Sequence, residues 1–195
     1  MTLIRAFIAI TLPSEIKTEL ESTIQKFKAQ RVKGVRWVAV ENIHLTLRFL
    51  GDTSPADLEQ LTKLLQAEST AYHSFSAEVA SVGAFPNSKR PRVIWVGFQA
   101  PAVLNELVAS IESAARSIGI QPEERGFSPH LTLGRVKKDA SPADILNLGA
   151  ALKSIDVGSL DGFSVTHFTL FRSDLRPQGP LYSVLAQFNL QAAVH

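Results

Sequence analysis

The chain has 195 residues, of which 45% are hydrophobic and 19% charged, so it has enough apolar residues for a core and is not intrinsically disordered. Twenty Lys and Arg residues against eighteen Asp and Glu residues leave a formal net charge of +2, which does not by itself indicate a nucleic-acid-binding protein. The absence of cysteine excludes disulfide bonds, a thiol nucleophile and thiolate metal sites.

A short apolar segment, residues 6–12, follows Arg5 near the N-terminus. Its length is at the lower limit for the core of a signal peptide, and it lacks a small-residue cleavage site, so we interpret residues 6–10 as a β-strand. Nowhere in the sequence does an apolar run approach 18 residues, so we expect no membrane-spanning helix. We expect a cytoplasmic protein that works as a monomer without an obligate protein partner.

Residues 14–29 are predicted to form a helix. Ser14 is a suitable N-cap, and apolar residues recur at helical spacing through Ile16, Leu20, Ile24 and Phe27. Basic side chains lie from the last turn of this helix to the next predicted strand. They suit either an RNA backbone or an ordinary solvated surface, and they are Lys28, Arg31, Lys33 and Arg36.

The next predicted strand, residues 43–50, contains His44-Leu45-Thr46-Leu47, which we call the first motif. Side chains alternate between the two faces of a strand, so the histidine and threonine share one face and the leucines share the other. Ser54-Pro55 is then typical of a helix start, with an N-cap followed by proline. A further strand is predicted at 75–83, and a second basic group lies in the loop after it, at Lys89, Arg90 and Arg92.

The second half of the chain repeats the first at an offset of 86–87 residues. A strand at 93–97, a helix at 101–118 ending at Gly119, a strand at 130–136, a helix from Ser141-Pro142 and a strand at 163–171 follow in the same order. His130-Leu131-Thr132-Leu133, the second motif, falls on the first motif. We therefore predict one domain, residues 1–195, built from repeat units 5–91 and 92–177 and a closing strand at 181–189.

This alternation of strands and helices suits either a parallel α/β sheet or an α+β fold. Neither a G-x-G-x-x-G sequence nor a P-loop follows any predicted strand, which weakens the case for a doubly wound nucleotide-binding sheet.

The two motifs carry the chemistry that the sequence predicts. If a pseudo-twofold axis relates the units, the two polar faces meet across a cleft. A pair of histidines can then act as acid and base in one turnover, and two hydroxyls can donate to phosphate oxygens. A zinc site needs a third ligand at suitable spacing, and a serine hydrolase needs a G-x-S-x-G turn; neither pattern is in the sequence.

Together with residues 5–10, 41–47 and 127–135, the paired motifs resemble those of the two-histidine phosphoesterases, and in particular the LigT-like RNA 2′,3′-cyclic phosphodiesterases. The resemblance extends over essentially the whole chain. It implies a bilobal, pseudo-twofold α+β fold in which two antiparallel sheets line a central cleft and helices lie outside. It also implies hydrolysis of a terminal 2′,3′-cyclic phosphate to a 2′-phosphomonoester without a metal or other cofactor, on RNA ends or nucleotides.

Site residues follow from the resemblance and from strand parity. By resemblance His44 is the proton donor, His130 the proton acceptor, Thr46 and Thr132 phosphate ligands, and Arg135 a further candidate phosphate ligand. Strict alternation places Arg135 opposite to Thr132 unless the strand ends or bulges there. Parity places Arg48 beside His44 and Thr46 as another phosphate ligand. Phe7 is a candidate for stacking on the terminal base, against a competing role in the core.

Three alternatives remain open from the sequence. The same chemistry could act on a small cyclic nucleotide or on ADP-ribose cyclic phosphate. It could also act on a 2′-5′ RNA linkage, in cleavage or ligation. A third possibility is an RNA- or nucleotide-binding module without turnover, although such a module has no need of two titratable groups.

Overall fold

The computed structural model describes residues 2–124, 126–157, 162–177 and 179–193, which form an α+β fold. Four α-helices are present in these ranges: α1 Ser14–Ala29, α2 Pro55–Ser69, α3 Val103–Ser117 and α4 Pro142–Ser154. A 3₁₀ turn, η1, spans Val40–Asn42. The strands are β1 Ile4–Thr11, β2 Val35–Trp37, β3 His44–Thr53, β4 Phe75–Phe85, β5 Val93–Gln99, β6 His130–Val136, β7 Phe163–Val165, β8 His167–Arg176 and β9 Gly179–Asn189.

The second helix of each repeat starts as the sequence predicts. The Ser54 side chain accepts a hydrogen bond from the Asp57 backbone N–H at 3.1 Å and caps α2. Ser141 and Asp144 form a reciprocal capping box at the start of α4. The first helix differs by one position, since Ser14 is its first residue and no side chain caps it.

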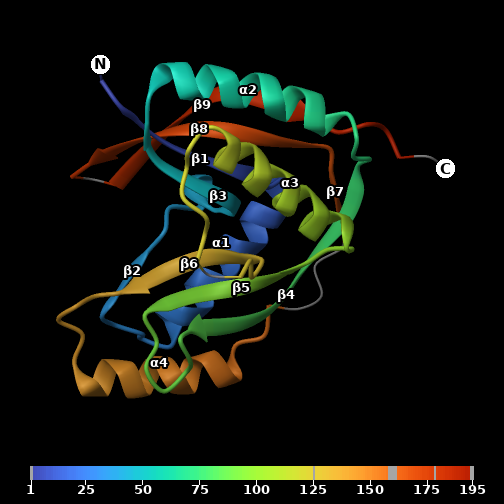
Figure 1. Cartoon of the computed structure of the whole chain (residues 1–195). Helices are drawn as coiled ribbons and strands as arrows, with labels where there is room; N and C mark the ends of the chain where they lie inside the picture. The colour runs from blue at the N-terminus through green and yellow to red at the C-terminus, as the bar shows by residue number, and fades with distance from the viewer. Residues whose placement is uncertain (1, 125, 158–161, 178, 194–195) are drawn as a thin grey trace.

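The strands form one continuous antiparallel sheet in the order β7-β4-β5-β6-β3-β1-β8-β9 (Figure 1). The expectation of two separate sheets is therefore wrong. The two halves, β7-β4-β5-β6 and β3-β1-β8-β9, are joined at the single residue pair Leu45–Leu131 between β3 and β6. Strand β2 also pairs with β6, farther along the same strand, and it was not predicted because it has only three residues.

Elements of the two repeats are exchanged between the halves of the sheet. Strand β4 from the first repeat pairs with β5, and β8 from the second repeat pairs with β1. The connectivity is symmetric, because interchanging β1 with β5, β3 with β6 and β4 with β8 reproduces the same pairings. Neither repeat can therefore form its half of the sheet alone.

The helices also pair between repeats, so that each helix of the first repeat contacts a helix, or the segment just after it, of the second. In one pair, the hydroxyl of Tyr72, just after α2, donates to the Glu106 carbonyl in α3 at 3.2 Å. In the other pair, Lys26 in α1 donates to the Asp156 carbonyl just after α4 at 3.1 Å. The motif leucines are buried in the core. No helix in the described part of the chain is long and apolar enough to cross a membrane.

Candidate active site

The two motifs meet at the junction of the half-sheets. Leu45 and Leu131 are directly paired and are 1% and 0% exposed, so both point into the core. Alternation then turns the flanking side chains to the opposite face of the sheet. In this antiparallel register each histidine is next to the threonine of the other motif, and the two histidines occupy diagonal corners. The four half-buried residues are His44, Thr46, His130 and Thr132.

Both imidazoles are anchored in the same way. The Nδ1 atom of His44 lies 2.7 Å from the Asn42 carbonyl oxygen, and the Nδ1 atom of His130 lies 2.7 Å from the Ser128 carbonyl oxygen. A carbonyl oxygen only accepts, so each Nδ1 carries a proton and donates it. Each Nε2 is thereby left for proton exchange with a substrate.

Aromatic side chains surround His44. The Phe7 ring stacks on the imidazole with centroids 4.8 Å apart at an angle of 27°, and Tyr182 meets it edge-on at 5.3 Å. Phe7 also stacks on Phe171 and is only 3% exposed. Of the two roles considered for Phe7, the structure gives core packing rather than stacking on a substrate base, since its faces are covered by His44 and Phe171.

Burial in this cluster lowers the pKa of His44 to about 4. The hydrogen bond to Asn42 opposes this shift, and the charge of Lys17 adds to it. The cause is the loss of water around the charged imidazole, which disfavours protonation. In the free protein at neutral pH, His44 is accordingly a neutral imidazole.

The lowered pKa of His44 predicts acid sensitivity. Above pH 6.5 His44 is neutral in both the folded and the unfolded state, so its burial costs no stability. As the pH falls towards 4, the unfolded chain takes up a proton that His44 in the folded state does not bind, so the folded state loses stability. The free energy of unfolding should drop by about 3 kcal/mol over this range, relative to a His44→Gln variant. Urea unfolding at a series of pH values measures it, and identical pH profiles for the two proteins would contradict burial of His44 as the cause.

His130 has a different aromatic neighbour. The Phe85 ring meets its imidazole edge-on at 5.0 Å, and Phe85 in turn packs on Trp95 at 5.2 Å. Trp95 fits here because Gly83 leaves room for it: a Cβ atom at Gly83 would lie 2.2 Å from the indole ring. A residue without a side chain is therefore needed beneath the aromatic pair that supports His130.

A β-bulge follows each threonine. In β3, Thr46 pairs with Ala9 and Arg48 with Ile8, so Leu47 is the extra residue. In β6, Thr132 pairs with Trp95 and Gly134 with Ile94, so Leu133 is the extra residue. An extra residue inverts the alternation beyond it. The bulges therefore return Phe49 and Arg135 to the histidine face, and both are exposed.

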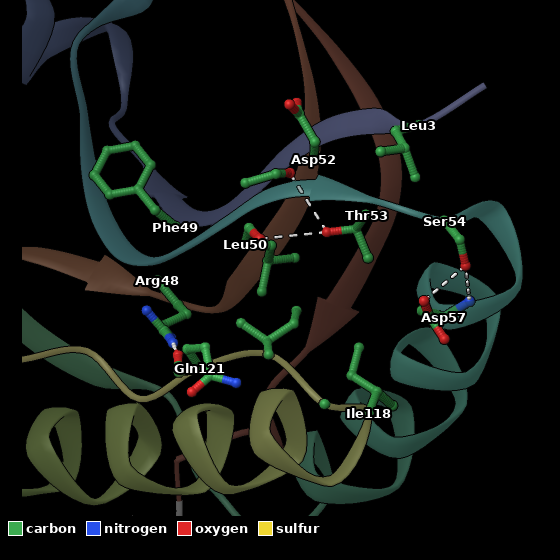
Figure 2. A pocket seen from close by; sticks show the side chains of 13 residues that line it. Leu3, Arg48, Phe49, Leu50, Asp52, Thr53, Ser54, Asp57, Ile118 and Gln121 are labelled. Carbon is green, nitrogen blue, oxygen red and sulfur yellow. Dashed lines mark hydrogen bonds between the residues drawn. The ribbon is translucent and has the colours of Figure 1, made fainter. Parts of the chain in front are cut away.

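Arg48 consequently does not lie on the histidine face, and its prediction as a phosphate ligand is wrong. It is only 6% exposed and points away from Phe49, towards Gln121 (Figure 2). Its Nε atom lies 2.6 Å from a Glu112 carboxylate oxygen, and its Nη1 atom lies 3.0 Å from a Glu123 oxygen. A hollow of about 570 Å³ beside it is lined by residues of β3, the start of α2 and the segment after α3, and by neither histidine.

Arg135 faces the other half of the sheet across the site. Burial raises the pKa of the Tyr182 hydroxyl, and the charges of Arg135 and Arg5 oppose that shift. A guanidinium on β6 therefore acts on a phenol on β9, next to His44. The aromatic residues Phe49, Phe171 and Tyr182 were not predicted as site residues, because only the strand exchange and the bulge bring them to the cluster of Phe7 and His44.

Comparison with known proteins supports the repeat and the fold. A family model described as LigT like Phosphoesterase matches twice, at residues 10–95 and 97–182. The RNA 2′,3′-cyclic phosphodiesterase of Methanothermobacter thermautotrophicus is 32% identical over 190 residues, which cover 96% of this chain and 99% of that protein. The enzyme of the same name from Methanocaldococcus jannaschii is 33% identical over 184 residues, covering 94% and 99%.

Solved structures share the whole fold. A protein of Thermus thermophilus superposes with a TM-score of 0.80 at 27% identity, covering 96% of this chain and 98% of that one. E. coli LigT complexed with 3′-AMP superposes with a TM-score of 0.76 at 28% identity, with the same coverage of 96% and 98%. The paired half-sheets are thus a shared architecture, and the two matched ranges start at the repeat offset inferred from the sequence.

Proposed function

The chain belongs to the LigT-like phosphoesterase family, and on this premise we propose that it hydrolyses the terminal 2′,3′-cyclic phosphate of RNA to a 2′-phosphomonoester. One observation carries the proposal: the Leu45–Leu131 pair brings two histidines and two threonines together on one face of the sheet. Because a single chain supplies both motifs, we propose that it acts as a monomer without an obligate protein partner.

In the proposed reaction, water attacks the cyclic phosphate in line with the 3′ oxygen. A bond forms between the water oxygen and phosphorus, and the bond between phosphorus and O3′ breaks. His130 Nε2 takes the proton of the attacking water, and His44 Nε2 gives a proton to O3′ as it leaves. The two carbonyl-anchored Nδ1 atoms support this role for Nε2, because they fix both rings with Nε2 as the exchanging atom.

His44 must take up a proton before it can act as donor. Its pKa of about 4 makes it neutral in the free enzyme, and an anionic phosphate beside Nε2 favours the charged form. Substrate binding is thus coupled to proton uptake in this proposal. The assignment of donor and acceptor rests on the family resemblance, since the hydrogen bonds of the two imidazoles are alike.

Thr46 and Thr132 are proposed to donate hydrogen bonds to the non-bridging phosphate oxygens, where charge develops in the transition state. Arg135 is proposed as a further phosphate ligand, which its position beyond the β6 bulge supports. No metal is part of the mechanism. Two imidazoles and two hydroxyls suffice for acid–base chemistry, and among the described residues no three His, Asp or Glu side chains gather as metal ligands would.

The test uses 5′-labelled oligonucleotides ending in a 2′,3′-cyclic phosphate, with excess EDTA present. We expect unimpaired turnover and a 2′-phosphomonoester as the product, because the donor to O3′ and the acceptor for water are side chains. A variant in which both histidines are replaced by alanine is the control for contaminating nucleases.

Loss of activity in EDTA with recovery on adding one specific metal would contradict the mechanism. A 3′-phosphomonoester product would contradict the positions of the two histidines around the phosphate. Joining of the labelled strand to a second strand with a 5′-hydroxyl would instead indicate 2′-5′ ligation.

A further inference from the structure

Two arginines lie side by side next to the candidate active site. Arg36 in β2 is the direct cross-strand partner of Arg135 in β6, so both side chains emerge on the same face. The neighbours of Arg36 in β2, Val35 and Trp37, pack against the core, which leaves Arg36 on the histidine face. Like charges placed directly opposite destabilise a sheet, so this pair costs stability in the free protein.

No carboxylate among the described residues neutralises the pair. Both arginines are exposed, and neither forms an ion pair with any residue in the part of the chain that the structure describes. Arg48, which has a structural role, instead forms ion pairs with two carboxylates. Two guanidiniums on the same face, each a planar set of donors, suit an oxygen anion, and phosphate in particular.

The position of the pair relates it to the proposed reaction. Thr132 pairs with Trp95 in β5 and Arg135 pairs with Val93. These two positions of β5 are two residues apart, so Arg135 lies about 6.6 Å along the sheet from Thr132. Arg36 lies on β2, which pairs with the same edge of β6 as β3 does, beyond the point where the pairing of β3 with β6 ends. The pair thus lies at the mouth of the site, beyond the threonines that face the reacting phosphate.

We propose, on the basis of the proposed function, that Arg36 binds the phosphodiester on the 5′ side of the terminal nucleotide, with Arg135 between it and the reacting phosphate. Arg135 lies nearer to the reacting phosphate, and Arg36 contacts only this upstream phosphate. The substrate class that the structure favours is therefore an RNA strand with at least one internal phosphodiester, rather than a cyclic mononucleotide.

The experiment compares two substrates with the same cyclic end. A 2′,3′-cyclic mononucleotide has no upstream phosphodiester, and a dinucleotide ending in the same nucleotide has one. Arg36→Gln should lower kcat/KM about 10-fold or more on the dinucleotide, since a charged hydrogen bond is lost, and leave the mononucleotide unchanged. The control Arg116→Gln, on exposed α3 surface, should change neither.

Two further readouts separate binding from folding. The slope of log kcat/KM against log salt concentration for the dinucleotide should become shallower by about 0.7 in Arg36→Gln, because one phosphate contact is lost. The melting temperature should stay the same or rise, because a repulsive pair is removed.

Equal losses on both substrates would overturn the proposal by placing Arg36 at the reacting phosphate. An unchanged kcat/KM on the dinucleotide, or a lowered melting temperature, would overturn it as well. A wild-type protein that turns over neither substrate overturns the proposed function instead. Calorimetric titration of wild type and Arg36→Gln with the dinucleotide then decides the role of Arg36, with weaker binding by the variant expected.

Discussion

Replacing His44 or His130 by alanine is expected to lower kcat by about 10²–10⁴, the usual contribution of a positioned general acid or base. Substrate binding should weaken far less, because Thr46, Thr132 and the arginines still hold the phosphate. Single-turnover kinetics with a cyclic-phosphate dinucleotide measure the chemical step directly. The loss of kcat in the double variant should be much smaller than the product of the two single losses, because the two imidazoles act as one unit in a single displacement.

A second substrate separates the two roles. When the 3′ leaving group is already acidic it needs no proton, so His44→Ala should recover much of its rate while His130→Ala should not. Recovery of His130→Ala alone would reverse the assignment of acid and base. If neither substitution slows wild-type chemistry, the paired-histidine mechanism is wrong. Matched unfolding curves for the variants exclude loss of structure as the cause.

The pattern of the two motifs was sufficient to predict how the histidines are placed. Leucines at alternate positions must face a core, so the polar residues between them must face away, and the structure confirms this at Leu45 and Leu131. The offset between the repeats also indicated that the motifs are equivalent. Their direct juxtaposition follows from strand pairing between distant segments, which local periodicity does not encode.

The prediction for Arg48, which relied on parity beyond the first motif, failed because β3 bulges there. An extra residue at Leu47 reverses the direction of Arg48, and no glycine or proline within the first motif signals it. The equivalent bulge at Leu133 has the opposite consequence, since it brings Arg135 to the histidine face. A β-bulge therefore makes the parity prediction for Arg48 wrong and removes the parity objection to Arg135, which was predicted by resemblance.

For Phe7 the sequence left base stacking and core packing open, and the structure gives core packing. In its own strand it is simply an apolar residue on the face of His44, where an exposed ring could stack on a base. Phe171 and Tyr182, which cover it, come from β8 and β9 more than 160 residues along the chain. Only the exchange of strands between repeats, which is a property of the tertiary structure, explains its burial.

Arg48→Met is expected to lower the free energy of unfolding by about 3 kcal/mol, because the buried member of a partly buried ion pair is removed. The arginine is 6% exposed, and its loss leaves Glu112 without a counter-charge and the Gln121 carbonyl without a donor. Methionine keeps the apolar stem, so the loss reports on the charge rather than on a cavity. Urea unfolding followed by circular dichroism measures it.

The chain offers a matched control in the exposed pair between Lys63 and Glu59, whose atoms are 2.7 Å apart on α2. Lys63→Met breaks this contact and should have no measurable effect, since solvent screens exposed pairs. Combining Arg48→Met with Glu112→Gln should recover part of the lost stability, because the half-buried Glu112 side chain is then neutral and no longer needs a counter-charge. A loss below about 1 kcal/mol for Arg48→Met, or no recovery in the double variant, would show that Arg48 does not hold β3 to α3 through its charge.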